Sequence, residues 1–282
     1  MLMACYEIEY DREPQTFGPA GELLVVASEE AWNGPAGDTL RKIMNQPYEV
    51  TLNPEPMMDV NWVRPAQFGR YLKPHRNVLI LEIGAKQPQQ TSFAVTRNRW
   101  GTDQINIDVK GSNANDVALT IASRANEIRN TLQAAESRRL ASFALKASND
   151  ALAENIQDHW GIQIAWPKDA ILQSKSDEFW LMERFMTRRK NGVNHDVTEI
   201  FFIHSEPIKE VDQLDPEYIV NRRDEVTQMN VHGSMENSYM IAERRVNPLS
   251  RRLTIDGLSA REIQGWWTME NDWMGGPYCS LT

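Results

Sequence analysis

The stretch GELLVVASEEAWNGPAGDTLRKIMNQ, residues 21–46, predicts a buried strand, a tight corner and an amphipathic helix. Residues 23–26 form a short continuous apolar run, which is typical of a central strand covered on both faces. The helix is expected to begin at Pro35, because proline lacks an N–H and is harmless only in a first helical turn. Three apolar side chains then share one helical face, namely Leu40, Ile43 and Met44.

A glycine-bearing corner between a strand and a helix also invites a phosphate-binding interpretation. Residues 33–39 do not fit it, because they lack the lysine of a P-loop. Pro35 removes one N–H donor, and Asp38 would face the bound anion. The corner is therefore interpreted as structural.

The rest of the chain predicts an α+β protein with two linked sheet-and-helix halves, the second largely antiparallel. Residues 1–20 form an N-terminal lipoprotein-like tether, residues 21–161 the first half and residues 162–282 the strand-rich half. Further strands are expected at 78–83, in a hairpin of 91–96 and 103–109, and at 162–166, 171–173, 179–185, 199–204, 239–245, 252–255, 260–269 and from 279 onward. The apolar residues of the segment 103–109 alternate with Asn106 and Asp108, which indicates a sheet with one solvated face.

Helices alternate with these strands. The longest is expected to start at Asn113 or Asn115 and to bury a face of Val117, Ile121, Ala125, Ile128, Leu132 and Ala135. A second begins after residues 148–150 and ends at Gly161, and a third begins with the cap Asp215 followed by Pro216. Residues 47–77 hold five prolines and predict an irregular connection with one short helix near residues 65–71. Residues 187–197 predict a polar hairpin tip.

Charge and cysteine content narrow the classes of partner and cofactor. The formal net charge of −9 opposes attraction to nucleic acid or to anionic lipid. The chain contains no apolar run of eighteen residues, so a membrane contact is expected only through a lipid anchor. The two cysteines, Cys5 and Cys279, lie at opposite ends without metal-ligand spacing, and neither metal nor cofactor is expected.

The C-terminal segment 265–278 is the strongest candidate for a binding site. Trp266, Trp267 and Trp273 could form a stacking platform, with Glu270 and Asp272 accepting hydrogen bonds. Adjacent tryptophans on a strand point to opposite faces, however, so at least one is expected in the core.

Two other groups of residues are candidates for a functional site. Glu262, Glu270 and Asp272 could supply the two carboxylates that a glycoside hydrolase needs. His75 and Arg76 precede a buried strand, where a base or an anion clamp can lie, although a satisfied histidine and an ion-paired arginine are the simpler interpretation.

Several stretches together resemble the DUF4837 family of Bacteroidetes envelope proteins. They are Trp32-Asn33-Gly34-Pro35 with Gly37-Asp38-Thr39-Leu40, Pro74-His75-Arg76-Asn77, Asn98-Arg99-Trp100, Gly233-Ser234, Ser238-Tyr239-Met240, Gly265-Trp266-Trp267 and Asn271 to Tyr278. The resemblance implies a lipoprotein signal, and Leu2-Met3-Ala4-Cys5 matches its cleavage pattern, so Cys5 is the expected lipidation site. It implies no activity. Two departures from the family pattern are that the signal is cut to four residues and that family members usually continue beyond the point matching Thr282. If the chain is a fragment, a last strand and helix are missing.

The sequence thus predicts a lipid-anchored, periplasm-facing module of the cell envelope that binds or assembles without catalysis. Its expected partners are an envelope glycan, a peptide or another envelope protein. The alternative is a periplasmic hydrolase acting on glycan or peptide, with Glu270 or Asp272 as acid or base.

Overall fold

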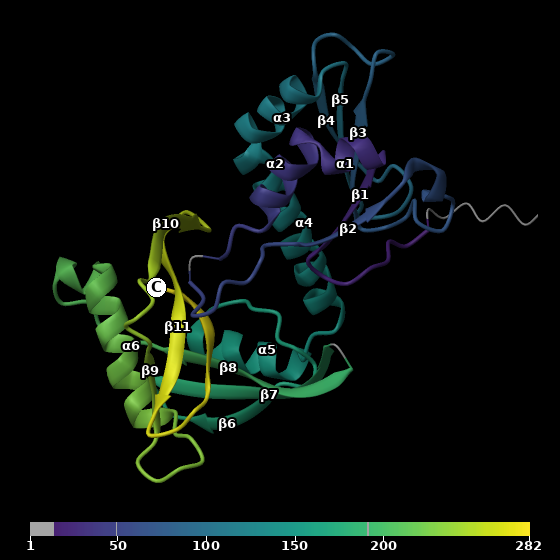
Figure 1. Ribbon diagram of the computed structural model, residues 1–282. Helices are drawn as coiled ribbons and strands as arrows, with labels where there is room; N and C mark the ends of the chain where they lie inside the picture. The colour runs from purple at the N-terminus through teal and green to yellow at the C-terminus, as the bar shows by residue number, and fades with distance from the viewer. Residues whose placement is uncertain (1–13, 49, 191) are drawn as a thin grey trace, which may run out of the picture. The chain divides into compact units, whose positions relative to one another are not determined.

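A computed structural model describes residues 14–48, 50–190 and 192–282 (Figure 1). The chain divides into two compact units. The N-terminal unit takes in the chain up to Pro47 and Glu55–Ser142, and the C-terminal unit takes in Tyr48–Pro54 and Phe143–Thr282. Each unit contains both helices and sheet, which confirms the α+β fold class.

The N-terminal unit is built on a five-stranded sheet of order β2-β1-β3-β5-β4. Its strands are β1 (Glu22–Ala27), β2 (Asp59–Val63), β3 (Asn77–Ile83), β4 (Ser92–Arg97) and β5 (Ile105–Gly111). The first four in this order run parallel, and only β4 is antiparallel to its neighbour β5. The apolar run of β1 lies between two parallel neighbours and is buried on both faces, as the sequence predicts.

The strand β2 was not predicted, and one face of β5 was predicted wrongly. The strand β2 is a short, partly exposed edge of five residues within the proline-containing stretch 47–77, which was expected to be an irregular connection. Asn106 and Asp108 were expected on a solvated face, but both are buried. They are tolerated there because Arg99 forms a two-pronged ion pair with Asp108 and Asn106 donates to the Gln104 side chain.

The helices of this unit are α1 (Glu29–Asn33), α2 (Pro35–Met44), α3 (Ala114–Ser123) and α4 (Ala125–Lys146), with a short 3₁₀ turn η1 (Pro65–Gln67). The helix α2 begins at Pro35 as predicted, and Ser28 caps α1 by accepting from the Ala31 N–H at 3.2 Å. The predicted longest helix is two helices, because Arg124 leaves helical geometry and ends α3. Its predicted apolar face is nevertheless buried, with Ala125 only partly so.

The C-terminal unit contains a three-stranded and a four-stranded antiparallel sheet. The first is formed by β6 (Ile171–Lys175), β7 (Phe179–Lys190) and β8 (Val193–His204), and the second by β9 (Tyr239–Ala242), β10 (Leu249–Ile255), β11 (Leu258–Glu270) and β12 (Gly275–Leu281). Its helices are α5 (Asp150–Trp160) and α6 (Pro216–Asn230), with a 3₁₀ turn η2 (Val211–Leu214). The second half is therefore antiparallel, as predicted.

Successive side chains of β7 point to opposite faces of its sheet, and both faces are covered by other elements. Trp180 and Met182 pack with α5 and Trp166, whereas Phe179 and Leu181 pack with residues of α6 and β11. The predicted strand at residues 162–166 is wrong: this segment pairs with no strand among the described residues, and its apolar character reflects the packing of Trp166 into the core.

Two predicted features of loops and caps also differ. The polar segment 187–197 contains the hairpin reversal between β7 and β8, as predicted, but the two strands are longer than expected and pair as far as Lys190 and Val193. Asp215 precedes α6 without a side-chain capping bond, while Pro216 takes the first helical position as expected. No helix among the residues that the structure describes is long and apolar enough to cross a bilayer.

Candidate functional site

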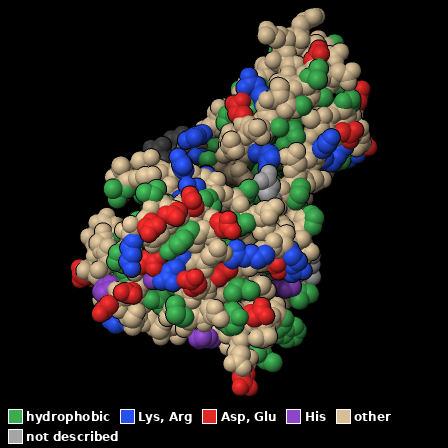
Figure 2. Space-filling model, turned by 90° about the vertical axis from the view of Figure 1, so that its left-hand side faces the viewer, with side chains coloured by type: hydrophobic (Ala, Val, Ile, Leu, Met, Phe, Trp, Pro, Cys, Tyr) green, Lys and Arg blue, Asp and Glu red, His purple; other side chains and the backbone are tan. Residues whose placement is uncertain are grey.

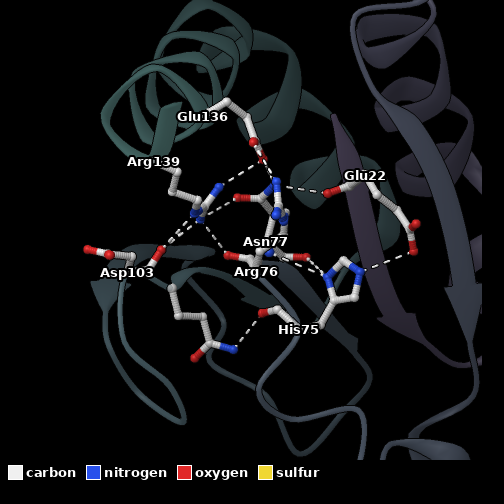
Figure 3. A network of polar contacts seen from close by, with 8 residues as sticks. Glu22, His75, Arg76, Asn77, Asp103, Glu136 and Arg139 are labelled. Carbon is white, nitrogen blue, oxygen red and sulfur yellow. Dashed lines mark hydrogen bonds and ion pairs between the residues drawn. The ribbon is translucent and has the colours of Figure 1, made fainter. Parts of the chain in front are cut away.

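The predicted residues His75 and Arg76 lie in a polar network of the N-terminal unit (Figure 3). The His75 ring is buried, with Nδ1 3.0 Å from the Asn77 carbonyl oxygen and Nε2 3.1 Å from a Glu22 carboxylate oxygen. The backbone N–H of Asn77 also lies 3.4 Å from Nδ1, so both ring nitrogens have hydrogen-bonding neighbours.

Glu136 of α4 is the centre of the network (Figure 3). Its carboxylate accepts from Arg76 Nη1 at 2.9 Å, from Asn77 Nδ2 at 2.7 Å and from Arg139 Nη1 at 2.8 Å. Arg139 also donates to the backbone carbonyls of Arg76 and Asp103 at 2.8 and 2.7 Å. Burial lowers the pKa of Arg139, and the charge of Glu136 opposes this shift. The network ties α4 to the segments that precede β3 and β5.

The position of this network indicates a structural role. Glu22 and Asn77 are the first residues of β1 and β3, so the network lies at the amino ends of the parallel strands. Ligands of open parallel sheets bind at the opposite, carboxyl ends. His75 and Arg76 are therefore part of a clamp between α4 and the sheet. This arrangement corresponds to the simpler interpretation of the sequence, a hydrogen-bonded histidine beside an ion-paired arginine.

A second group of polar residues comes together in the C-terminal unit, where two segments far apart in sequence meet. We call them the loop cluster: residues 231–238 between α6 and β9, and residues 271–274 between β11 and β12. The Ser234 hydroxyl donates to the Asp272 carboxylate at 3.2 Å, and Asn271 Nδ2 donates to the Asn237 carbonyl at 3.1 Å. These bonds hold the two segments side by side.

Local sequence explains why the segments approach so closely. Asn271 adopts a left-handed conformation with φ of 57°, and Asp272 accepts from the Trp273 N–H at 2.7 Å, so the turn is stabilised from within. A Cβ at Gly233 would lie 2.6 Å from Ser238 Oγ and 2.9 Å from Asp272 Oδ2. Glycine at this position therefore permits the contact.

The three predicted tryptophans do not form one platform. Trp267 packs into the core with Met240 and Met269, and Trp266 lies on the opposite face of β11, partly exposed. Trp273 belongs to the loop cluster and is 95% exposed. Trp273 and Asp272 therefore lie on the turn after β11, whereas the side chains of Trp266 and Trp267 leave the strand itself on opposite faces.

A pocket of about 400 Å³ opens at the first segment of the loop cluster. It is lined by Gln228, His232, Met235, Asn237, Ser238 and Tyr239. It borders the turn of Trp273 because the carbonyl of Asn237 accepts from Asn271. Sequence reasoning did not propose Met235, Asn237 or Tyr239 as site residues, although Ser238-Tyr239-Met240 was among the family-like motifs.

Two of the predicted carboxylates, Glu262 and Glu270, do not converge as a glycosidase pair would. Glu262 is bound by both nitrogens of the Arg251 fork at 2.7 Å. It precedes Glu270 by eight residues on β11, and a rise of about 3.3 Å per residue places them about 26 Å apart. Hydrolysis of a glycoside needs two carboxyl groups within about 10 Å. The third carboxylate, Asp272, accepts hydrogen bonds from the Ser234 hydroxyl and the Trp273 N–H within the loop cluster.

The remaining candidates are quickly placed. Cys5 lies outside the described residues. Cys279 on β12 is an exposed free thiol whose pKa is raised chiefly by desolvation. No group of three or more histidine, cysteine, aspartate or glutamate residues in the described part of the chain is placed to hold a metal ion.

Several basic side chains of the C-terminal unit form ion pairs with acidic neighbours. Arg245 pairs with Glu243 at 2.5 Å, and Arg244 pairs with Asp224 at 2.5 Å. Figure 2 shows Lys and Arg side chains interspersed with Asp and Glu on the face in view. Positive and negative side chains are therefore mixed on that face.

The architecture and the loop cluster define an α+β protein of two successive domains. Residues 149–282 match the family described as Domain of unknown function (DUF4837), which confirms the suspected resemblance for this part of the chain. Residues 16–144 match a second family, Domain of unknown function (DUF8532). The family-like motifs before residue 144 thus fall in the DUF8532 match. The chain has no significant match among curated proteins or solved structures.

Proposed function

We propose that this protein is a non-catalytic binding or assembly module of the bacterial cell envelope, and that the loop cluster is its binding surface. The observation that carries the proposal is the exposure of Trp273. A tryptophan that is 95% exposed on a short, internally bonded turn contributes nothing to the core, whereas aromatic side chains of this kind are frequent anchors in binding sites.

The hydrogen bonds of the loop cluster support this proposal. A binding residue is most effective when its loop is held in place before the ligand arrives. The bonds from Ser234 to Asp272 and from Asn271 to Asn237 supply such preorganisation. Polar groups that line the adjoining pocket can orient a ligand. The separation of Glu262 from Glu270 removes that pair of carboxylates as a glycosidase acid and base.

The proposal includes a lipid anchor on Cys5 that places the module on the periplasmic side of an envelope membrane. Its support is the sequence Leu2-Met3-Ala4-Cys5, which matches a lipoprotein cleavage pattern. Metabolic labelling with a fatty-acid analogue, in a precursor with a complete signal, should modify the wild type. Label that persists in Cys5→Ala would contradict the anchor.

Binding is tested by titrating the chain with soluble peptidoglycan fragments that contain both glycan and stem peptide. We expect saturable changes in the indole N–H signal of Trp273, followed by NMR, and weaker binding by Trp273→Ala. Leu258→Ala is the matched control, because Leu258 is also exposed but lies at the other end of β11. Equal binding by both variants would remove the loop cluster as the binding surface.

A further inference from the structure

The exposed apolar side chains of the loop cluster are those of two methionines and of Trp273. Met235 is 57% exposed in the first segment, and Met274 is 39% exposed next to Trp273 in the second. Methionine is unbranched and polarizable, and it is characteristic of surfaces that adapt to peptides of varied shape. A sugar-binding platform, in contrast, needs a flat aromatic face with converging polar groups.

The charges of the loop cluster have one sign. Glu236 lies in the first segment and Asp272 in the second, and Glu270 is the last residue of β11, directly before the second segment. His232 is the only titratable base in the two segments as described. The described part of the cluster contains no lysine or arginine that would neutralise these carboxylates.

The helix α6 adds to this negative potential. Its fifteen residues end at Asn230, directly before the first segment of the loop cluster. The carboxyl end of a helix carries a partial negative charge, and Gln228 in its last turn lines the pocket. A ligand that carries positive charge is therefore complementary to the pocket as well as to the turn.

We propose that the loop cluster binds an extended peptide segment of a partner protein through a lysine or arginine side chain that contacts the Trp273 ring. The inference rests on the proposed binding function and specifies its ligand. The indole face attracts a cation, and the neighbouring carboxylates of Glu270 and Asp272 favour the same charge. Met235 and Met274 pack against the apolar residues that flank the basic side chain.

The test compares three probes by NMR titration, using the Trp273 indole and the methionine methyl signals as reporters. The probes are an acetylated peptide of repeating Gly-Lys-Gly-Leu units, the same peptide with glutamate in place of lysine, and a tetramer of N-acetylglucosamine. We expect the lysine peptide to bind about tenfold more tightly than the glutamate peptide, with affinity falling as salt is added.

Variants separate recognition by the ring from attraction by the acidic chain as a whole. Trp273→Ala keeps every charge and should weaken binding of the lysine peptide about five- to thirtyfold, because a cation–π contact contributes about 1–2 kcal/mol. Glu270→Gln should weaken it and reduce its salt dependence, and Leu258→Ala should leave it unchanged.

The outcomes distinguish this inference from the function on which it rests. Binding of the sugar tetramer through Trp273, without binding of the lysine peptide, overturns the inference and retains the binding module. Equal binding of both peptides, or no loss in Trp273→Ala, also overturns it. A chain that binds none of the three probes and no peptidoglycan fragment loses both proposals.

Discussion

Glu136→Ala is the substitution that most directly tests the clamp of the N-terminal unit. The Glu136 carboxylate accepts three hydrogen bonds, two of them from arginines, and its side chain is 20% exposed. Removing one partner from a buried ion pair costs about 3–5 kcal/mol. Because this site retains some contact with solvent, we expect a loss of about 2–4 kcal/mol.

The assay has to report on one unit, since two units need not unfold in a single transition. Hydrogen exchange read by mass spectrometry on peptides covering β3 does so. A loss of 2–4 kcal/mol corresponds to exchange about 30- to 1000-fold faster, provided that these amides exchange through unfolding of the unit. Peptides covering β7 in the C-terminal unit should keep their protection.

Glu127→Ala is the matched control on the same helix. Glu127 also pairs with an arginine, Arg124, at 2.7 Å, but both side chains are nearly half exposed. Such a pair contributes about 0–1 kcal/mol. If Glu136→Ala accelerates exchange in β3 no more than Glu127→Ala does, the network does not clamp the sheet and the reasoning fails.

Three further predictions concern the C-terminal unit. Gly233→Ala should destabilise it by about 1–3 kcal/mol in urea denaturation, because the added Cβ would clash within the loop cluster. The control Gly69→Ala, in the N-terminal unit, adds a Cβ to open space and should change stability by less than about 0.5 kcal/mol. Equal effects of the two substitutions would contradict the close approach at Gly233. Trp273→Ala should leave the melting temperature unchanged, while Met269→Ala, deleting a buried side chain, should cost about 2–4 kcal/mol; a large loss for Trp273 would show that the ring supports the fold. The hydrogen bond from Arg245 lowers the pKa of Glu243 from 4.5 to about 2, so the stability it confers is present above pH 4.5 and is lost as the pH falls toward 2. The difference in melting temperature between wild type and Glu243→Gln should therefore shrink across that window, and a constant difference would refute the assignment.

The sequence determined the elements whose side chains repeat with one clear period. The run from Leu23 to Val26 gave a strand buried on both faces, and the spacing from Val117 to Ala135 gave a buried helical stripe, because burial selects apolar residues at the period of each structure. Proline at position 35 marked a helix start for a purely local reason, its missing N–H.

The polar clamp could not be read from the sequence. Arg76 and Glu136 lie sixty positions apart, and nothing local indicates that α4 brings its carboxylate to the start of β3. Asp108 is a second case. Its place in the alternation predicts a solvated side chain, yet it is buried, because the ion pair with Arg99 from the preceding loop offsets the cost of burial.

The loop cluster was predicted in part from the sequence and decided in part by the tertiary structure. Asn271 and Asp272 are residue types typical of turns, so this side of the cluster could be recognised in the sequence, whereas Gly233 stood out only as part of a family-like motif. Which of the three tryptophans is exposed depends on where β11 ends, on the face of the strand from which each side chain projects, and on which elements cover that face. That choice is made by the packing of whole sheets and helices, so only the tertiary structure decided that Trp267 is core and Trp273 is exposed.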